Sequence, residues 1–292
     1  MYELNKVNDK IYYINCPAKI GIYKISENDI YLIDSGNDSE MGRKILKIIN
    51  ENNWHLLGII NTHSNADHVG GNHFLQTRTN CKIISSELEN AITKFPILES
   101  SFLYGGYPCK SLRNKFLMAE ASIPTNDIKN YPIDDLEYIS LGGHFFDMIG
   151  IKINDVCFLA DSLFGENIIN KYHFFFIYDV RKFLETLDKI ELIDAKIFIP
   201  AHADATNNIK PLIELNRNKV YEIIDIILDF CKQSICFEDL LKKLFDHYNL
   251  ILTIEQYALV GSTIKSYLSY LNEENKIEII FENNKMYWKS IA

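Results

Sequence analysis

Residues 62–68 read Thr-His-Ser-Asn-Ala-Asp-His and place three metal-binding side chains, His63, Asp67 and His68, within six positions. The preceding run, Leu-Leu-Gly-Ile-Ile-Asn at 56–61, is apolar and is typical of a buried strand. A strand that ends at imidazole and carboxylate groups holds them at a rigid edge. Since these two ligand types together suit zinc, iron or manganese, the sequence predicts a metal site at this strand end.

Three later segments repeat the arrangement of an apolar run followed by a His or an Asp. They are Gly143-His144, Asp161 after Phe-Leu-Ala (158–160), and Ala201-His202 after Ile-Pro (199–200). Any one of them is also explained by turn chemistry, because Gly, Asp and His are common in loops. All of them in ordered succession indicate strand ends that carry ligands to one point.

In these motifs the chain resembles the metallo-β-lactamase superfamily, which carries His-x-His-x-Asp-His, then Gly-His, then an Asp after a strand, then a final His. The likeness covers about residues 10–205 and implies an α/β fold, the αββα sandwich. It implies one cation held by His63, residue 65 and His144, and a second held by Asp67, His68 and His202. Asp161 would bridge the two. Asp34, in Leu-Ile-Asp-Ser-Gly (32–36), resembles the family's early turn and is interpreted as a structural residue.

Asn65 departs from the family pattern, which has histidine at this position. An amide oxygen is neutral and is a poorer ligand for zinc than imidazole. Three states therefore remain open: one tight ion at the second site, two ions of which one is loose, or Mn²⁺ or iron in place of Zn²⁺. If Asn65 does not touch metal, it could donate a hydrogen bond to a developing oxyanion. His73, on the helix expected next, is assigned to a surface or packing role.

The ligand set predicts a metal-dependent hydrolase in which a metal-bound hydroxide is the nucleophile and Asp67 orients it. A small ester, thioester or lactone is the favoured substrate, because a net charge of −9 does not suit phosphate-rich partners. Three alternatives stay open. They are an endoribonuclease or other phosphodiesterase of the same fold, a di-iron protein that reacts with oxygen or nitric oxide, and a non-enzymatic metal-responsive regulator.

Length and composition indicate an intracellular protein with two domains. The chain has 292 residues, no apolar run long enough for a membrane span and no signal-peptide pattern at its start. Its six cysteines form no Cys-x-x-Cys pair and are interpreted as reduced thiols. We expect a cytoplasmic location.

Two regions differ from the sandwich pattern. Residues 87–130 are rich in aromatic side chains and are interpreted as a helical insertion of the catalytic domain (1–212), which either covers an apolar substrate or packs on the sandwich or on a second copy in a homodimer.

Residues 213–292 contain three helical patterns, at about 213–232, 237–248 and 253–271, and a hairpin at 276–281 and 285–288. This is the plan of a winged helix. Residues 217–292 hold nine basic and eleven acidic residues, so packing, dimer formation or walling of the cleft is favoured over nucleic-acid binding.

Overall fold

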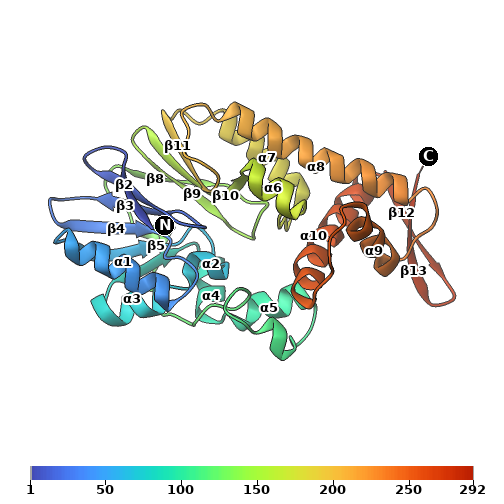
Figure 1. The fold of residues 1–292 in the computed structure, drawn as a ribbon, viewed down its shortest axis with the longest axis horizontal. Helices are drawn as coiled ribbons and strands as arrows, with labels where there is room; N and C mark the ends of the chain where they lie inside the picture. Colours follow the sequence, from blue (N-terminus) through green and yellow to red (C-terminus); the bar gives the residue numbers. More distant parts are fainter. Residues whose placement is uncertain (1, 292) are drawn as a thin grey trace.

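A computed structural model describes residues 2–291 and contains two stacked β-sheets with helices on both outer faces (Figure 1). The first sheet has seven strands in sequence order, and the second has four in the order β11-β10-β9-β8. The first sheet comprises β1 (Glu3–Lys6), β2 (Ile11–Asn15), β3 (Ile20–Lys24), β4 (Asp29–Ile33), β5 (His55–Ile60), β6 (Lys82–Ser85) and β7 (Asn126–Asp127). The second comprises β8 (Leu136–Ser140), β9 (Ile149–Ile153), β10 (Val156–Phe164) and β11 (Ile197–His202).

Helices α1 (Ser39–Glu51) and α3 (Asn72–Thr79) cover the first sheet, and α7 (Val180–Glu191) and α8 (Lys210–Phe230) cover the second (Figure 1). Met41, Ile45 and Ile49 recur every four residues along α1 and are buried, so this stripe faces the sheet. Between the sheets, isoleucines of β5 and β9 are packed in one buried apolar cluster. The predicted αββα sandwich is therefore confirmed.

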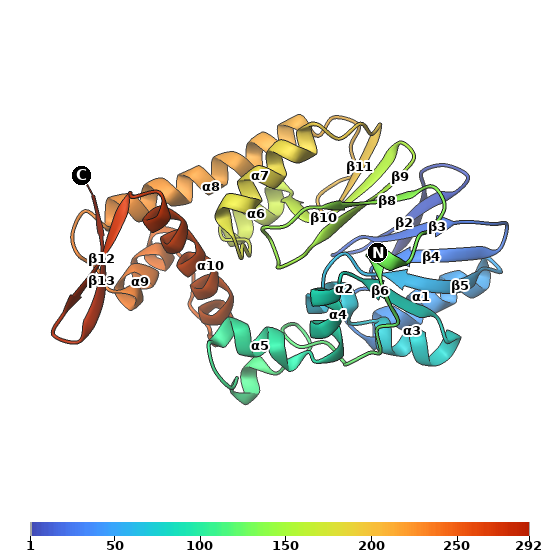
Figure 2. The same ribbon diagram turned by 180° about the vertical axis from the view of Figure 1, so that it is seen from behind.

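The segment between β6 and β7 is helical. It contains α4 (Glu87–Lys94), α5 (Ile97–Tyr104) and the short 3₁₀ helix η1 (Lys110–Leu112); a second 3₁₀ helix, η2 (Ile128–Asn130), follows β7. Leu103, Leu112 and Leu117 of this insertion form a buried cluster with Ala258, which lies far along the chain. Figures 1 and 2 both place α5 beside the C-terminal helix α10 (Ile254–Glu273). The insertion thus joins the sandwich to the C-terminal part.

The C-terminal part contains α8, α9 (Phe237–His247), α10 and the hairpin of β12 (Ile277–Glu282) and β13 (Lys285–Ser290), in the order expected for a winged helix. Helix α8 runs from the second sheet into this part (Figure 2). Residues of both parts, such as Leu187 and Leu244, share one hydrophobic core. The division at residue 212 stays a prediction, because α8 belongs to both sides. Within residues 2–291, no helix combines the length and hydrophobicity that a bilayer crossing requires.

Candidate metal centre

The six ligands predicted from the sequence lie together in two overlapping groups. His63, His144 and Asp161 form the first group, and Asp67, His68, Asp161 and His202 form the second. In each group the ligand atoms lie within 4.8 Å of one another. Asp161 belongs to both groups, as a bridging ligand would. The structure therefore brings together all of these residues, although their role as ligands stays a prediction.

Local backbone geometry aims these side chains at one point. Strand β10 shifts register on either side of Ala160, which has a positive φ of 48°, and Asp161 follows directly. Such a bulge re-aims the next side chain. Gly143, before His144, has φ 119°, and a Cβ there would lie 2.3 Å from the backbone nitrogen of Phe183. Only glycine fits this turn, so the Gly-His pair is explained by close contact with α7.

Tight packing also positions the one-turn helix α2 (Ala66–Val69), which carries Asp67 and His68. A Cβ on Gly71 would lie 2.3 Å from the carbonyl oxygen of Ser35. The Gly70-Gly71 pair thus lets the backbone after α2 approach the loop that follows β4. This close approach brings His68 next to Asp34.

All four histidines are oriented by an outer hydrogen bond at Nδ1. The His68 Nδ1 lies 2.8 Å from Asp34 Oδ2, and the His63 Nδ1 lies 3.1 Å from Thr62 Oγ1. His144 and His202 place Nδ1 at 2.8 and 2.9 Å from the carbonyl oxygens of Phe176 and Pro17. Since a metal-binding histidine donates its other ring N–H to such a partner, Nε2 of each ring is left for a cation.

Asp34 forms the turn expected from the sequence and also supports two of the candidate ligands. Its φ of 65° confirms the turn. Its carboxylate also accepts hydrogen bonds from the Thr62 backbone N–H and hydroxyl at 2.8 and 2.7 Å, in addition to the contact with His68. Through Thr62, the same carboxylate supports His63. Asp34 is therefore the shared support of one histidine from each group.

Buried polar atoms without partners test whether the residues fit a cation. His63 Nε2, His68 Nε2 and Asp161 Oδ1 are buried and make no hydrogen bond, although His68 Nε2 lies 2.9 Å from Asp161 Oδ1. An unpartnered buried polar group costs about 1–3 kcal/mol, and several converging on one point are satisfied together by a cation. Three or four His and Asp ligands match the donor set of zinc. The residues fit a divalent cation.

The electrostatics of the cluster agree with this fit. Burial opposes charge on His68, but Asp161, Asp67 and Asp34 outweigh burial and raise the pKa of His68 well above its usual value. Burial likewise opposes charge on Asp161, but His202 and His68 hold the pKa of Asp161 well below its usual range. Burial lowers the pKa of His144, so that ring is neutral. Protons and a cation therefore compete for the same atoms.

Two buried carboxyl groups near the centre were not predicted from the sequence. Glu99 of α5 accepts a hydrogen bond from Asn65 Nδ2 at 2.7 Å, and Glu89 of α4 accepts from the Ser64 N–H and hydroxyl and from the Asp147 N–H. Burial raises the pKa of Glu89 to about 7. Both acids belong to the insertion and both hold residues of the 62–68 segment. His73, by contrast, lies outside both groups and contacts Glu120 at the surface.

A cavity of about 500 Å³ opens over the two groups. Its floor includes Asn65, Asp67, His144, Asp161 and His202. Its walls are mostly apolar and come from the insertion, from the end of β10 and the segment after it, and from α10. They include Leu103, Phe116, Leu117, Phe164, Ile168, Phe174, Phe175, Phe176 and Leu259. The site can therefore hold an apolar group against a cation.

The model of the metallo-β-lactamase superfamily matches residues 16–202. A β-lactamase domain protein from Burkholderia ambifaria is structurally similar, with 14% identity, a TM-score of 0.76 and coverage of 99% of this chain and 94% of that one. A metallo-β-lactamase family protein from Thermus thermophilus has 15% identity and a TM-score of 0.71, and the match covers 99% of this chain and 98% of that one. A metallo-β-lactamase from Pontibacter korlensis has 15% identity and a TM-score of 0.56, and the match covers 76% of this chain and 99% of that one. No curated protein matches significantly. The first two similarities extend across the C-terminal part.

Proposed function

The chain belongs to the metallo-β-lactamase superfamily and is a metal-dependent hydrolase, and on this premise we propose that it cleaves a small ester, thioester or lactone with an apolar acyl group. The apolar cavity directly over the ligand groups carries this proposal. Among the described residues that line it there is no Lys or Arg. Since anionic substrates require such partners, an uncharged substrate suits this cavity better.

A second cavity, of about 410 Å³, adjoins the first at Pro17, Asp67, Phe116 and Tyr172. The two cavities therefore meet beside Asp67. We infer that the acyl group lies in the larger cavity and that the alcohol or thiol leaves through the smaller one. This places the scissile bond beside the ligand groups.

The ligand groups and the cavity have separate roles in this proposal. Zn²⁺ is the cation that we propose, because four imidazoles surround the position, and when bound it would polarise the carbonyl and activate water. Asp67 is half-buried where the two cavities meet, in position to accept a hydrogen bond from the attacking water and orient it. The apolar walls hold the acyl group and exclude bulk water.

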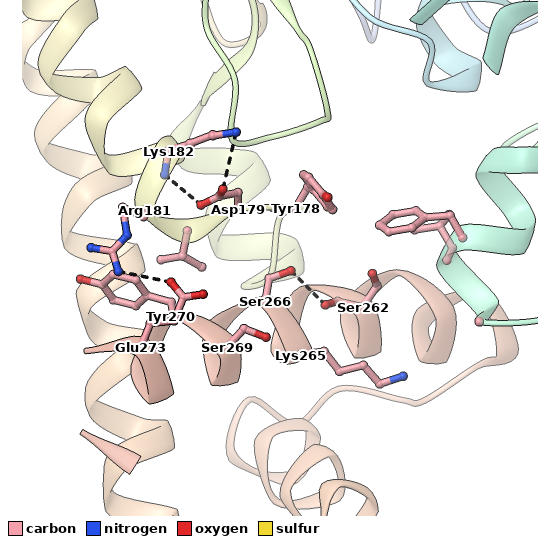
Figure 3. A pocket seen from close by; sticks show the side chains of 14 residues that line it. Tyr178, Asp179, Arg181, Lys182, Ser262, Lys265, Ser266, Ser269, Tyr270 and Glu273 are labelled. Atoms are coloured by element: carbon pink, nitrogen blue, oxygen red, sulfur yellow. Dashed lines mark hydrogen bonds and ion pairs between the residues drawn. The ribbon is translucent and has the colours of Figure 1, made fainter. Parts of the chain in front are cut away.

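The phosphodiesterase alternative would need Lys or Arg at the site, and among the described residues none lines the cavity over the ligand groups. Arg181, Lys182 and Lys265 line a different cavity (Figure 3). The two cavities share Leu103. Arg181 pairs with Glu273 and Lys182 with Asp179, and Lys265 lies over the ring of Phe237. With their charges engaged in this way, these side chains do not supply a phosphate-binding surface at the metal centre.

Turnover of a substrate panel tests the proposal. Zn²⁺-loaded protein is assayed with nitrophenyl acetate, butyrate and hexanoate, with a thioester and a lactone, and with bis-nitrophenyl phosphate. Each CH₂ that enters the apolar cavity contributes about 0.8 kcal/mol, so kcat/KM is expected to rise about fourfold per methylene. Asp161→Ala serves as the inactive control. Faster turnover of the phosphodiester than of every ester would refute the proposal, and bound iron with an oxygen-sensitive visible spectrum would support the di-iron alternative.

A further inference from the structure

Asn65 stands between a carboxylate and an imidazole. Its amide nitrogen donates a hydrogen bond to Glu99 Oε1 at 2.7 Å, and its amide oxygen lies 3.0 Å from His144 Nε2. The contact with Glu99 therefore holds the nitrogen end of the amide away from His144. The oxygen of Asn65 therefore points toward the first ligand group.

The contact between Asn65 and His144 brings two possible ligand atoms together, the amide oxygen and Nε2. His144 Nδ1 lies 2.8 Å from the carbonyl oxygen of Phe176, which can only accept, so the ring proton is at Nδ1. A metal-binding imidazole keeps its single N–H for such a partner, so Nε2 is the atom that His144 would offer to a cation beside the Asn65 oxygen. Two ligands of one cation with bonds of about 2.1 Å are separated by about 3.0–3.4 Å. The observed 3.0 Å spacing fits a shared cation.

Glu99 is held firmly enough to fix the amide. The residue is 3% exposed and lies on α5 one turn before Leu103, which lines the same cavity. Its neighbour Ser100 donates to the carbonyl oxygens of Leu112 and Leu117, which ties α5 to the rest of the insertion. The orientation of the Asn65 amide is thus set by the insertion rather than by the 62–68 segment itself.

We propose that Glu99 is a positioning residue that holds the Asn65 carboxamide with its oxygen inward, so that Asn65 takes the place of the absent histidine as a ligand of the first cation. This proposal rests on the metal centre of the proposed hydrolase. It favours a ligand role for Asn65 over an oxyanion-donor role. It also assigns a function to the insertion beyond covering the substrate.

Titration calorimetry with Zn²⁺ tests the proposal on the metal-free wild type, Glu99→Met, Asn65→Ala and the double variant. The wild type should bind two ions. Glu99→Met should weaken the weaker site by about 10- to 100-fold and leave the tighter site unchanged. The double variant should match Asn65→Ala, because Glu99 acts only through the amide. Glu87→Met, which removes an exposed acid from α4, is the matched control and should bind as the wild type does.

Four results would overturn the proposal: a single Zn²⁺ in the wild type, an unchanged or tighter weak site in Glu99→Met, a double variant weaker than Asn65→Ala, or a Glu87→Met control that loses affinity equally. A tighter site would mean that the amide is reversed and caps His144. If Glu99→Met does not fold by circular dichroism, Glu99→Gln replaces it, with an expected loss of about 3- to 10-fold at the weak site only, and no loss overturns the proposal. Loss of both sites in every protein, wild type included, would instead refute the hydrolase.

Discussion

Replacing Asp34 by asparagine should weaken both ligand groups, although Asp34 binds no cation in our interpretation. The carboxylate is 3% exposed and accepts three hydrogen bonds. One oxygen accepts from the Thr62 N–H, and the other accepts from the Thr62 hydroxyl and lies 2.8 Å from His68 Nδ1. An asparagine oxygen can replace only one of these oxygens, so its amide N–H faces another donor. His68 would then lose its charged support.

The size of the effect follows from these contacts. A support of this kind typically contributes 10- to 100-fold in metal affinity, or about 1.4–2.7 kcal/mol. We expect a loss in this range at the second group, through His68, and a smaller loss at the first group, where the effect passes through Thr62 to His63. Thr62→Val removes only the hydroxyl that links Asp34 to His63. It should therefore weaken the first group and leave the second unchanged.

Zn²⁺ affinities of the two sites, measured by calorimetry, would check this order. Asp29→Asn is the matched control, because Asp29 forms an Asp–His pair of 3.0 Å with His55 at the protein surface. It should change neither affinity. If Asp34→Asn binds Zn²⁺ as tightly as the wild type does, or if Asp29→Asn causes the same loss, the support that we assign to Asp34 is wrong.

Three further predictions concern the cavity, a buried acid and the Gly-His turn. Leu259→Trp should lower kcat/KM for the hexanoate ester by about 10-fold and leave the acetate ester unchanged, because the indole fills the apolar end of the cavity; equal losses would contradict this. Burial raises the pKa of Glu89 to about 7, so the folded state binds this proton more tightly and the unfolding free energy falls by about 3 kcal/mol between pH 5 and 8. Glu89→Gln should remove this fall in denaturant titrations, and Glu87→Gln should not. Gly143→Ala should lower the unfolding free energy by about 2–4 kcal/mol, because φ is 119° and Phe183 leaves no room for a Cβ; an unchanged melting curve would contradict this.

The sequence predicted those parts of the site that depend on local order along the chain. His63 and His202 lie where β5 and β11 end, whereas Asp67 and His68 follow on α2 and Asp161 lies inside β10. An apolar run near a candidate ligand is a local feature that periodicity reveals. The sandwich itself was implied by the resemblance to the metallo-β-lactamase superfamily, which these same motifs carry. The six ligands could thus be named before their distances were known.

Except for Thr62 beside His63, the supports of the ligands could not be predicted, because they join residues far apart in the sequence. Glu99 reaches Asn65 across 34 positions, and Asp34 reaches His68 across 34. An acid within Ile-Leu-Glu-Ser-Ser-Phe-Leu (97–103) gives one weak signal, because a charge in an apolar helical run is costly unless it has a buried partner. That signal indicates burial without naming the partner.

The winged-helix plan of the C-terminal part does not by itself indicate nucleic-acid binding, and the packing of α10 argues for another role. In a helix-turn-helix, the N-terminal residues of the recognition helix contact the bases. Here Ala258, in the first turns of α10, is buried against Leu103 and Leu112 of the insertion, and Leu259 lines the cavity. Part of the surface that would enter a DNA groove, at Ala258 and Leu259, is therefore covered from within the same chain. We expect the C-terminal part to form a wall of the substrate cavity, so that changes in α10 alter acyl preference while a gel-shift assay detects no DNA complex.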